Sequence, residues 1–496
     1  MSDNGKVQKG LMWTYAERIT AQGVSFIVSV ILSRRIDPEH FGTISLVLIF
    51  IGICNVFVTN GFGVGLVQKK KIDDLDFSTV FFFSIFIGIT LYALVFFSAP
   101  FLSDFFECGD ITLVIRIIAL RIPIASINTI QHSYVERHML FRKFFFSTLG
   151  GTLASAVVGI TMAYMGFGIW ALVFQYLTNT VIDTIVLFFT VDWRPHLQFS
   201  FMRLKPMFSF GWKVLAASLI DTLYTDLRNF IIGKRYSSAD LAYYNKGYQI
   251  PHMIVVNINA SLSKVLFPAL SMKQEEPDAI RSMVSRTIKT STYLMCPLLI
   301  GLFVVAKPLV LLLYTEKWLD SVLYIQIFSI TYLFMPINSI NQQAIKAVGR
   351  SDISLIVEIV KKVFGVALII ATVVFLDTPI ALAGSFSIYT FISLFINAYP
   401  GKKLYSYSCL EQILDILPAL CIGVVMGIIT YIPSSFISNY FILLPLQVVI
   451  GAIVYIGLSR LFKLEAFVFT KNALLGFIQN KKDITKKEKQ SGKSYK

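Results

Sequence analysis

Long apolar segments recur along almost the whole chain, separated by short stretches rich in charge, Pro or Gly. A helix crosses the hydrocarbon of a bilayer with about 20 apolar residues. Segments near this length lie at residues 10–32, 41–67, 79–103, 111–132, 144–165, 168–190, 208–232, 248–270, 288–313, 319–343, 353–375, 380–399, 411–432 and 440–458. The pattern predicts an all-α polytopic membrane protein with about 14 transmembrane helices, or about twelve if the last two segments pack differently.

Composition and loop lengths exclude several classes of protein. Of the 496 residues, 55% are hydrophobic and 15% are charged, whereas a soluble domain carries about 25% charged residues. No predicted loop exceeds about 17 residues, which leaves no room for a soluble catalytic domain. Neither a complete phosphate-binding P-loop nor a G-x-S-x-G motif occurs, and the histidines lack metal-ligand spacing. We therefore predict that the protein is not an enzyme and needs no cofactor or metal.

The basic excess follows the predicted topology. The chain has 44 Lys and Arg against 29 Asp and Glu, a formal net charge of +15. Of the basic residues, 29 fall on the same side as the N-terminus and seven on the other. Since cytoplasmic loops carry the Lys and Arg excess, both termini are predicted to be cytoplasmic, with no cleaved signal peptide. The charge thus reports orientation, and we predict no nucleic-acid partner.

A short internal repeat predicts the domain organisation. Ile31–Arg35 resembles Ile231–Arg235, 200 residues later, and each stretch closes the first helix of a six-helix set. An even number of helices gives both sets the same orientation, as in parallel repeats related by a pseudo-two-fold axis along the membrane normal. The predicted domains are two six-helix lobes at 1–200 and 201–402, helices 13 and 14 at 403–465, and a basic cytoplasmic tail at 466–496 near anionic lipid.

Charged residues inside the predicted spans point to a binding site. A charge at the bilayer centre costs at least about 2.5–3.5 kcal/mol, so such residues should face water or a partner. Polar positions recur at steps of three and four, which places them on one face of each helix. These stripes are Thr14-Arg18-Gln22-Ser25-Ser29, Ser218-Asp221-Thr225-Arg228, Arg121-Asn128-His132, Asn257-Ser261-Lys264 and Ser354-Glu358-Lys361. His132 and His138 themselves are interpreted as polar surface residues at loop edges.

Basic residues within the spans outnumber acidic ones, eight against chiefly five. The excess predicts a water-filled, net-positive cavity that both halves line and that holds an anionic substrate. The substrate-binding candidates are Arg18, Arg121, Arg228, Lys264 and Lys361. The alternative is that these charges pair across the bundle and only hold helices together.

Energy coupling has two candidate carboxylates. Asp221 and Glu358 each lie on a polar stripe within three or seven residues of a base. A proton or cation bound there would release the neighbouring base to engage the substrate. A permanent ion pair between helices is the alternative for both residues.

Several segments resemble the bacterial polysaccharide flippases, of the O-antigen and colanic-acid type, in the multidrug/oligosaccharidyl-lipid/polysaccharide exporter superfamily. The segments are ILSRRIDPEHFGTISL, NGFGVGLVQKKKIDDLDFSTVF, SYVERHMLFRKFF, FGWKVLAASLIDTLYTDLRNFIIGKRYSSADLAYYNKGYQIP and KVLFPALS. The order and spacing of these segments are more specific than any one of them.

The resemblance implies a protein of the bacterial cytoplasmic (inner) membrane that serves lipopolysaccharide or exopolysaccharide biosynthesis. Its substrate would be a polyprenyl-pyrophosphate-linked oligosaccharide, flipped from the inner to the outer leaflet. Membrane lipids, a polysaccharide polymerase and glycosyltransferases are the partner candidates. In such flippases, basic residues of the first and eighth helices meet the pyrophosphate, and Arg18 and Lys264 occupy comparable positions. A cation-coupled multidrug antiporter of the same superfamily is the alternative, and a scaffold of an assembly complex is a third class.

Overall fold

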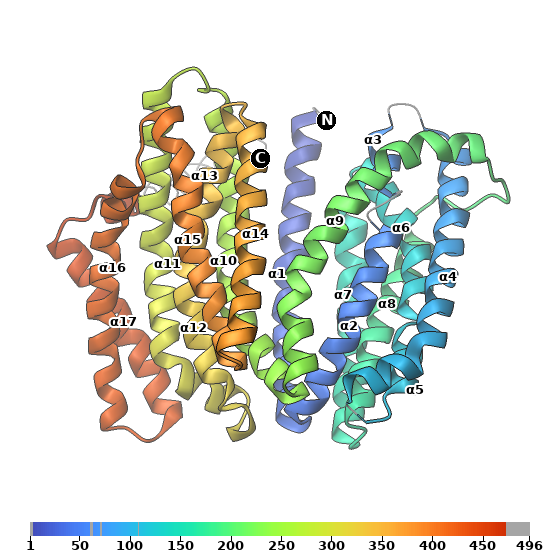
Figure 1. Ribbon diagram of the computed structural model, residues 1–496, viewed down its shortest axis with the longest axis horizontal. Coiled ribbons are helices and arrows are strands. Elements are labelled where there is room, and N and C mark those ends of the chain that lie inside the picture. The colour runs from blue at the N-terminus through green and yellow to red at the C-terminus, as the bar shows by residue number, and fades with distance from the viewer. Residues whose placement is uncertain (1–2, 60–62, 70–71, 108, 473–496) are drawn as a thin grey trace, which may run out of the picture. The chain divides into compact units, whose positions relative to one another are not determined.

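The computed structural model describes residues 3–59, 63–69, 72–107 and 109–472, and every regular element among them is a helix (Figure 1). Within these residues, 11 helices are long and apolar enough to cross a membrane. The protein is therefore an all-helical polytopic membrane protein, as predicted. Three further long helices, α1 (Asp3–Arg35), α9 (Phe201–Arg235) and α14 (Ser351–Phe375), miss this criterion because of their polar residues. The total of fourteen spans stays a prediction.

The chain forms two compact units. The first comprises the residues up to Tyr243 together with Leu313–Lys317, and the second comprises Tyr244–Leu312 and the chain from Trp318 onward. The remaining helices that begin in the first unit are α2 (Pro38–Thr59), α3 (Gly63–Gln68), α4 (Asp74–Phe106), α5 (Thr112–Ile118), α6 (Arg121–Arg137), α7 (Phe141–Tyr164), α8 (Ile169–Thr190) and α10 (Ser238–Ser271).

Helix α10 continues into the second unit. The other elements there are α11 (Pro277–Leu313), η1 (Glu316–Trp318), α12 (Ser321–Leu333), α13 (Met335–Ala347), α15 (Pro379–Tyr405), α16 (Cys409–Tyr431), η2 (Ile432–Ser435) and α17 (Tyr440–Leu461). The segment Leu313–Lys317 groups with the first unit. It contains the last residue of α11 and the first two residues of η1. The part of the predicted tail at residues 473–496 lies outside the described residues.

The helix boundaries repeat along the chain. Helix α1 ends at Arg35 and α2 begins at Pro38, while α9 ends at Arg235 and α10 begins at Ser238. In both sets the fourth span is split, into α5 and α6 in one and α12 and α13 in the other. The sequence Pro-Ile-X-Ser-Ile-Asn also occurs twice, at residues 123–128 and 336–341. These matches support the internal repeat that the sequence predicts.

Packing and the internal repeat assign helix α9 to different parts of the molecule. By packing it groups with the first unit, where it contacts α2, α3 and α4. By the repeat it is the first helix of the second six-helix set. The division at residue 200 therefore stays a prediction.

Two spans predicted as single helices are interrupted. The predicted helix 111–132 is α5 and α6, and 319–343 is α12 and α13. Each break lies just before a proline, Pro123 or Pro336, which lacks an N–H and clashes with the carbonyl four residues earlier. The predicted helix 41–67 includes α2 and α3, and residues 60–62 between them lie outside the described residues.

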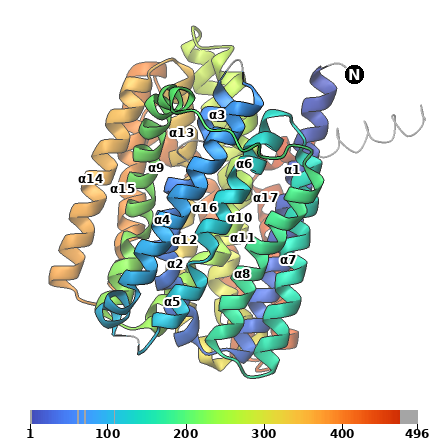
Figure 2. The same ribbon diagram turned by 90° about the vertical axis from the view of Figure 1, so that its right-hand side faces the viewer.

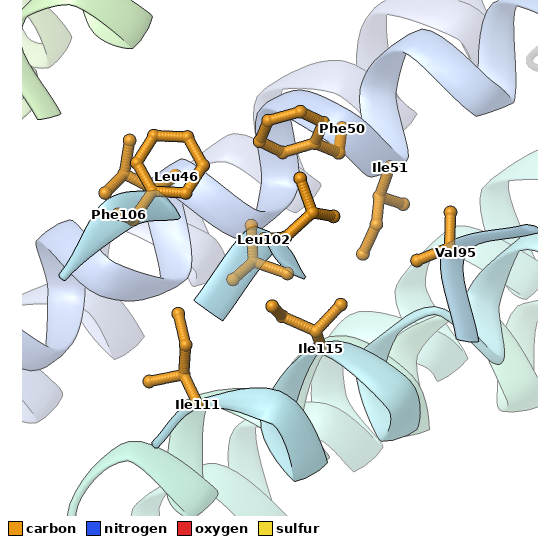
Figure 3. A pocket seen from close by; sticks show the side chains of 9 residues that line it. Leu46, Phe50, Ile51, Val95, Leu102, Phe106, Ile111 and Ile115 are labelled. Atoms are coloured by element: carbon orange, nitrogen blue, oxygen red, sulfur yellow. The ribbon is translucent and has the colours of Figure 1, made fainter. Parts of the chain in front are cut away.

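The core of the first unit lies where α2, α4 and α5 meet, beside the closely packed pair α7 and α8 (Figure 2). Apolar side chains from these three helices leave a cavity of only about 10 Å³ (Figure 3). The labelled lining residues are Leu46, Phe50, Ile51, Val95, Leu102, Phe106, Ile111 and Ile115. So small a space without polar partners holds no water, and the contact is a dry, tightly packed one.

A buried carboxylate fixes the start of α4. Asp73 and Asp76 form a capping box, in which each side chain accepts a hydrogen bond from the backbone N–H of the other. The Asp76 side chain is 0% exposed and lies 2.6 Å from Lys69 Nζ and 3.5 Å from Arg203 Nη1. Asp76 thereby connects α4 to the first turn of α9 and to the segment after α3.

The other end of α4 is also tied to α9. Lys234 Nζ lies 2.9 Å from a carboxylate oxygen of Glu107, the residue that caps α4. The hydrogen bond from Lys234 and its charge lower the pKa of Glu107. Two charged contacts, one at each end, thus hold α9 along α4.

In the second unit, α16 and α17 lie side by side, and both contact α11 (Figure 1). Gly423 of α16 meets the Cys296 side chain so closely that an added Cβ would overlap the sulfur. On α17, the Tyr455 hydroxyl donates to the Tyr293 carbonyl oxygen at 2.8 Å. The predicted helices 13 and 14 are therefore anchored to α11.

Candidate functional site

The predicted site residues divide between the two units. Arg18, Arg121, Asp221 and Arg228 lie in the first unit, on α1, α6 and α9. Lys264, Glu358 and Lys361 lie in the second, on α10 and α14. Each unit is therefore considered by itself.

Arg121 begins α6 and faces α8. Its Nε donates to the Thr180 hydroxyl at 3.0 Å, and its guanidinium lies 5.2 Å from the centre of the Tyr176 ring. These partners are neutral, so the positive charge is held within the bundle by a hydroxyl dipole and a ring face. The predicted role of Arg121 in binding an anion stays a prediction.

The next polar residues of α6 meet an acid on α8. Asn128 Nδ2 donates to Asp183 Oδ2 at 2.6 Å, and His132 Nε2 lies 3.5 Å from the same oxygen. Ser147 of α7 lies near Asp183, and its hydroxyl donates to the Phe144 carbonyl oxygen. The predicted stripe Arg121-Asn128-His132 therefore lies against a second stripe, Tyr176-Thr180-Asp183.

Helix α1 adds a second carboxylate to this region. Glu17, which is half-buried, lies near Thr148 of α7 and near the charged groups of Arg18, His132 and Asp183. We call Glu17, Asn128, His132, Ser147 and Asp183 the first-unit polar cluster. A second carboxylate, that of Glu17, therefore lies near Asp183, and Glu17 directly precedes Arg18 in the sequence.

Sequence reasoning did not include the central members of this cluster among the site residues. Neither Glu17 nor Asp183 is among the site residues predicted from the sequence, and His132 is interpreted there as a polar surface residue. In the structure the His132 side chain is 40% exposed. Its ring stacks on that of Phe144, with 4.7 Å between the ring centres. The available signal was the spacing of Tyr176, Thr180 and Asp183 on α8, which follows the same three-and-four rule as the other stripes.

The remaining first-unit candidates differ in exposure. Arg228 is buried, with 4% of its surface exposed, while Arg18 and Asp221 are exposed. Asp221 and Arg228 lie on the same stripe of α9, two turns apart. The coupling role of Asp221 stays a prediction.

In the second unit, two predicted residues come together. Lys361 Nζ lies 2.6 Å from a carboxylate oxygen of Glu358, one turn earlier on α14. The Lys361 side chain is 9% exposed, whereas that of Glu358 is 42% exposed. The ammonium group is therefore buried while its partner reaches the surface of the bundle. Lys264, on α10, is exposed.

Lys361 also lines a cavity of about 140 Å³. The other lining residues are Thr331, Tyr332, Met335, Asn338, Phe386, Tyr389, Thr390 and Ser393. This volume holds several water molecules, and the hydroxyl and amide groups supply hydrogen-bond partners for them. The cavity can therefore hydrate the ammonium group of Lys361 or admit a small anionic group beside it.

A network of buried amides fixes one wall of this cavity. Asn397 Nδ2 donates to Asn338 Oδ1 at 2.8 Å, and Gln342 Nε2 donates to Asn397 Oδ1 at 2.8 Å. Ser354, on α14, donates to Gln342 Oε1 at 2.7 Å. These bonds lock α13 to α14 and α15, because an unpaired amide in such a site costs about 1–3 kcal/mol.

Residues 31–323, more than half of the chain, match the family described as polysaccharide biosynthesis protein. The chain is similar to the lipopolysaccharide biosynthesis protein WzxC of Escherichia coli, with 23% identity over 71% of this chain and 72% of that protein. It is also similar to the teichuronic acid biosynthesis protein TuaB of Bacillus subtilis, with 23% identity over 95% of this chain and 98% of that protein. The succinoglycan biosynthesis transport protein ExoT of Rhizobium meliloti is 22% identical over 63% of each chain.

Two solved structures share the fold. The lipid II flippase MurJ, in an inward closed conformation, matches with a TM-score of 0.74 and 15% identity over 91% of this chain and 98% of that one. An inward-facing multidrug resistance MATE family transporter of the MOP superfamily matches with a TM-score of 0.59 and 12% identity, over 77% of this chain and 95% of that one. These structures show the fold, and the family model shows the family: because it matches residues 31–323, the chain belongs to the polysaccharide biosynthesis protein family.

Proposed function

We propose that the protein is a flippase that moves polyprenyl-pyrophosphate-linked oligosaccharide units from the inner to the outer leaflet for cell-surface polysaccharide synthesis. The observation that carries this proposal is the presence of cations within the helical bundle of each unit. Arg121 is held by a hydroxyl group and a ring, and the buried Lys361 lines a cavity of about 140 Å³. Because buried charge is costly, such residues are retained where they serve an anionic substrate.

The chemistry of the substrate fits these cations. A pyrophosphate and a hydrated glycan cannot enter hydrocarbon without losing their hydrogen bonds to water. Arginine and lysine side chains replace those bonds with charge-assisted ones. In this proposal Arg18 and Lys264 meet the pyrophosphate, and Arg121, Arg228 and Lys361 complete the cationic lining. The lobes 1–200 and 201–402 rock about the site and give alternating access.

The proposed energy source is an ion gradient that acts on Asp221 and Glu358. The 2.6 Å contact between Glu358 and Lys361 supports a coupling role for Glu358. Protonation of Glu358 would weaken that contact and leave Lys361 available to an anion in the neighbouring cavity. A static ion pair that holds one turn of α14 in place is the alternative.

Family membership separates this function from the multidrug antiporter alternative. The likeness to the MATE transporter supports that alternative by fold alone. The matched family and the three relatives are instead named for the biosynthesis or transport of polysaccharides. In this proposal the protein is a transporter of the bacterial cytoplasmic membrane with both termini in the cytoplasm, and it works beside a polysaccharide polymerase or glycosyltransferases.

A reconstituted flipping assay tests the proposal. Vesicles that contain the purified protein and a fluorescent lipid-linked oligosaccharide are treated with a reductant that does not cross the bilayer. With the wild type, the reductant should react with the probe of both leaflets, because flipping brings the inner probe to the outside. The variants Arg18→Ala, Lys264→Ala and Lys361→Met should slow the reaction of the inner probe. Lys402→Ala is the matched control, since Lys402 is an exposed base near the end of α15. Efflux of cationic drugs without flipping of the lipid-linked substrate would refute the proposal.

A further inference from the structure

A second cavity, about 620 Å³ in volume, lies at the N-terminal end of α11, where the chain returns after α17. Six of its lining residues carry the argument: Ser282, Ser285, Arg286, Lys289, Thr290 and Lys463. None of them belongs to the proposed transport site. The cavity therefore needs an account of its own.

The first turns of α11 present one polar face to this cavity. Ser285 and Arg286 each lie three or four residues from Ser282 and from Lys289, so the four residues share one side of the helix. The opposite side, with Ile280 and Val284, is buried in the core of the second unit. Because core packing fixes this helix rotation, the hydroxyl groups and cations are held in place before any ligand arrives.

The turn after α17 contains a left-handed residue that carries a side chain. Lys463 N–H donates to the Arg460 carbonyl oxygen and Leu464 N–H donates to that of Ser459, the pattern of a Schellman motif. The left-handed position of this motif usually holds glycine, but here it holds Lys463, with φ of 49°. A residue with a Cβ is strained in this conformation, and such strain is concentrated at functional sites.

Ion pairs hold the walls of the cavity together. Lys289 Nζ lies 3.0 Å from Glu465 and 3.3 Å from Asp415 of α16. Asp415 also accepts hydrogen bonds of 2.6 Å from Ser285 and from the Tyr407 hydroxyl. Burial, and the hydrogen bond to Asp415, raise the pKa of Tyr407, so its hydroxyl remains a donor. Lys289 is thus committed to carboxylates.

Arg286, Lys463 and Thr290 remain for a ligand. The Arg286 guanidinium rests over the Phe469 ring, 4.7 Å from its centre, and the residue is exposed. Lys463 is exposed as well. The Thr290 hydroxyl oxygen is buried and has no hydrogen-bond partner among the described residues. A guanidinium, an ammonium and a hydroxyl group around one space are the donors that a phosphate requires.

We propose that this cavity binds the phosphate of an anionic phospholipid headgroup. Its volume lies within the range of small-molecule sites, about 300–1,000 Å³. Exposed apolar side chains flank it, among them Phe462 and Phe469, and offer contact to the acyl chains. Beyond Asn472 the sequence continues with seven Lys against two acidic residues, and each Lys near an anionic bilayer adds about 1 kcal/mol of attraction. These features favour a lipid over free phosphate.

Thermal unfolding of the purified full-length protein in detergent tests the proposal. Phosphatidylglycerol, phosphatidylcholine and inorganic phosphate are added separately, and the midpoint of unfolding is followed against ligand concentration. Phosphatidylglycerol should stabilise the wild type, and the other two should not. The double variant Arg286→Gln/Lys463→Gln should need about tenfold more phosphatidylglycerol for the same shift. The matched control, Lys402→Gln/Lys403→Gln, should behave as the wild type.

A second variant separates binding from folding. Lys463→Gly removes the ammonium group but relieves the left-handed backbone, so without lipid it should be at least as stable as the wild type. It should nevertheless respond more weakly to phosphatidylglycerol. An equal response of the wild type and both cavity variants would overturn the site. Equal protection by inorganic phosphate would overturn the lipid as its occupant.

Discussion

Replacing Asp183 by alanine removes the carboxylate on which the first-unit polar cluster converges. Its side chain is 17% exposed and accepts a 2.6 Å hydrogen bond from Asn128, a charge-assisted contact that contributes about 1.5–3 kcal/mol. The 3.5 Å contact with His132 adds little, because that ring is 40% exposed. The substitution also leaves the buried Asn128 amide without this acceptor. We expect Asp183→Ala to lower the free energy of unfolding by about 3 kcal/mol and Asp183→Asn by about 1–2 kcal/mol.

Titration of the purified protein in mixed micelles with a denaturing detergent measures these differences. The matched control is Asp192→Ala, because Asp192 also pairs with a base, Lys143 at 3.2 Å, but its side chain is 87% exposed. This control should show no measurable loss of stability. Equal unfolding curves for Asp183→Ala and the wild type would show that the cluster does not hold α6 to α8. If Asp183→Asn stays folded but no longer flips the substrate, the cluster serves transport as well as packing.

Three further predictions concern packing and coupling. Asp76→Ala should lower the free energy of unfolding by about 2–3 kcal/mol, because it leaves two cations without their buried carboxylate. Asp352→Ala, which breaks an exposed ion pair, should cause no measurable change in the same titration. Gly423→Ala should destabilise the protein because the new Cβ overlaps α11, whereas Gly457→Ala, with open space around it, should match or exceed wild-type stability in a thermal melt. Glu358→Gln should flip substrate without responding to an imposed proton or sodium gradient in reconstituted vesicles, and a wild type that ignores both gradients would contradict this coupling role.

Much of the fold could be predicted from the sequence because lipid demands long apolar helices. The apolar segments located the helices, and the missed breaks occur at Pro123 and Pro336, whose effect depends on local context. Pro297 and Pro308, for example, lie within the continuous helix α11. Membrane helices tolerate proline where neighbouring groups satisfy the freed carbonyl, and a sequence does not show those neighbours.

The internal repeat contains one position at which the sequence likewise does not show the neighbours that decide the residue type. Gly42 corresponds to Ala242 in the repeat, and the sequence offers no reason for the difference. In the structure, a Cβ at Gly42 would overlap the backbone of Ser238. The close approach of α2 to the start of α10 therefore requires glycine at this position. Such a requirement arises from packing between segments about 200 residues apart, which no local pattern reports.

The candidate site was predictable as stripes but not as contacts. The spacing of Arg121, Asn128 and His132 correctly placed these residues on one face of the split fourth span. The partner stripe, which includes Asp183, lies more than 50 residues later on α8. Which residues of α8 face the first stripe depends on how far each helix is rotated about its axis. That rotation is fixed by the packing of the whole bundle rather than by either segment alone.

Among the residues of the predicted stripes, a base meets a carboxylate in each unit: His132 meets Asp183 in the first, and Lys361 meets Glu358 in the second. The two pairs differ in chemistry. His132 is an imidazole that meets Asp183 beside the amide of Asn128, whereas Lys361 is a buried ammonium group whose partner carboxylate is 42% exposed. An anion that enters the cavity beside Lys361 therefore competes directly with Glu358 for the ammonium group. If the protein moves an anionic lipid-linked substrate, replacing Lys361 should change the substrate concentration that transport requires.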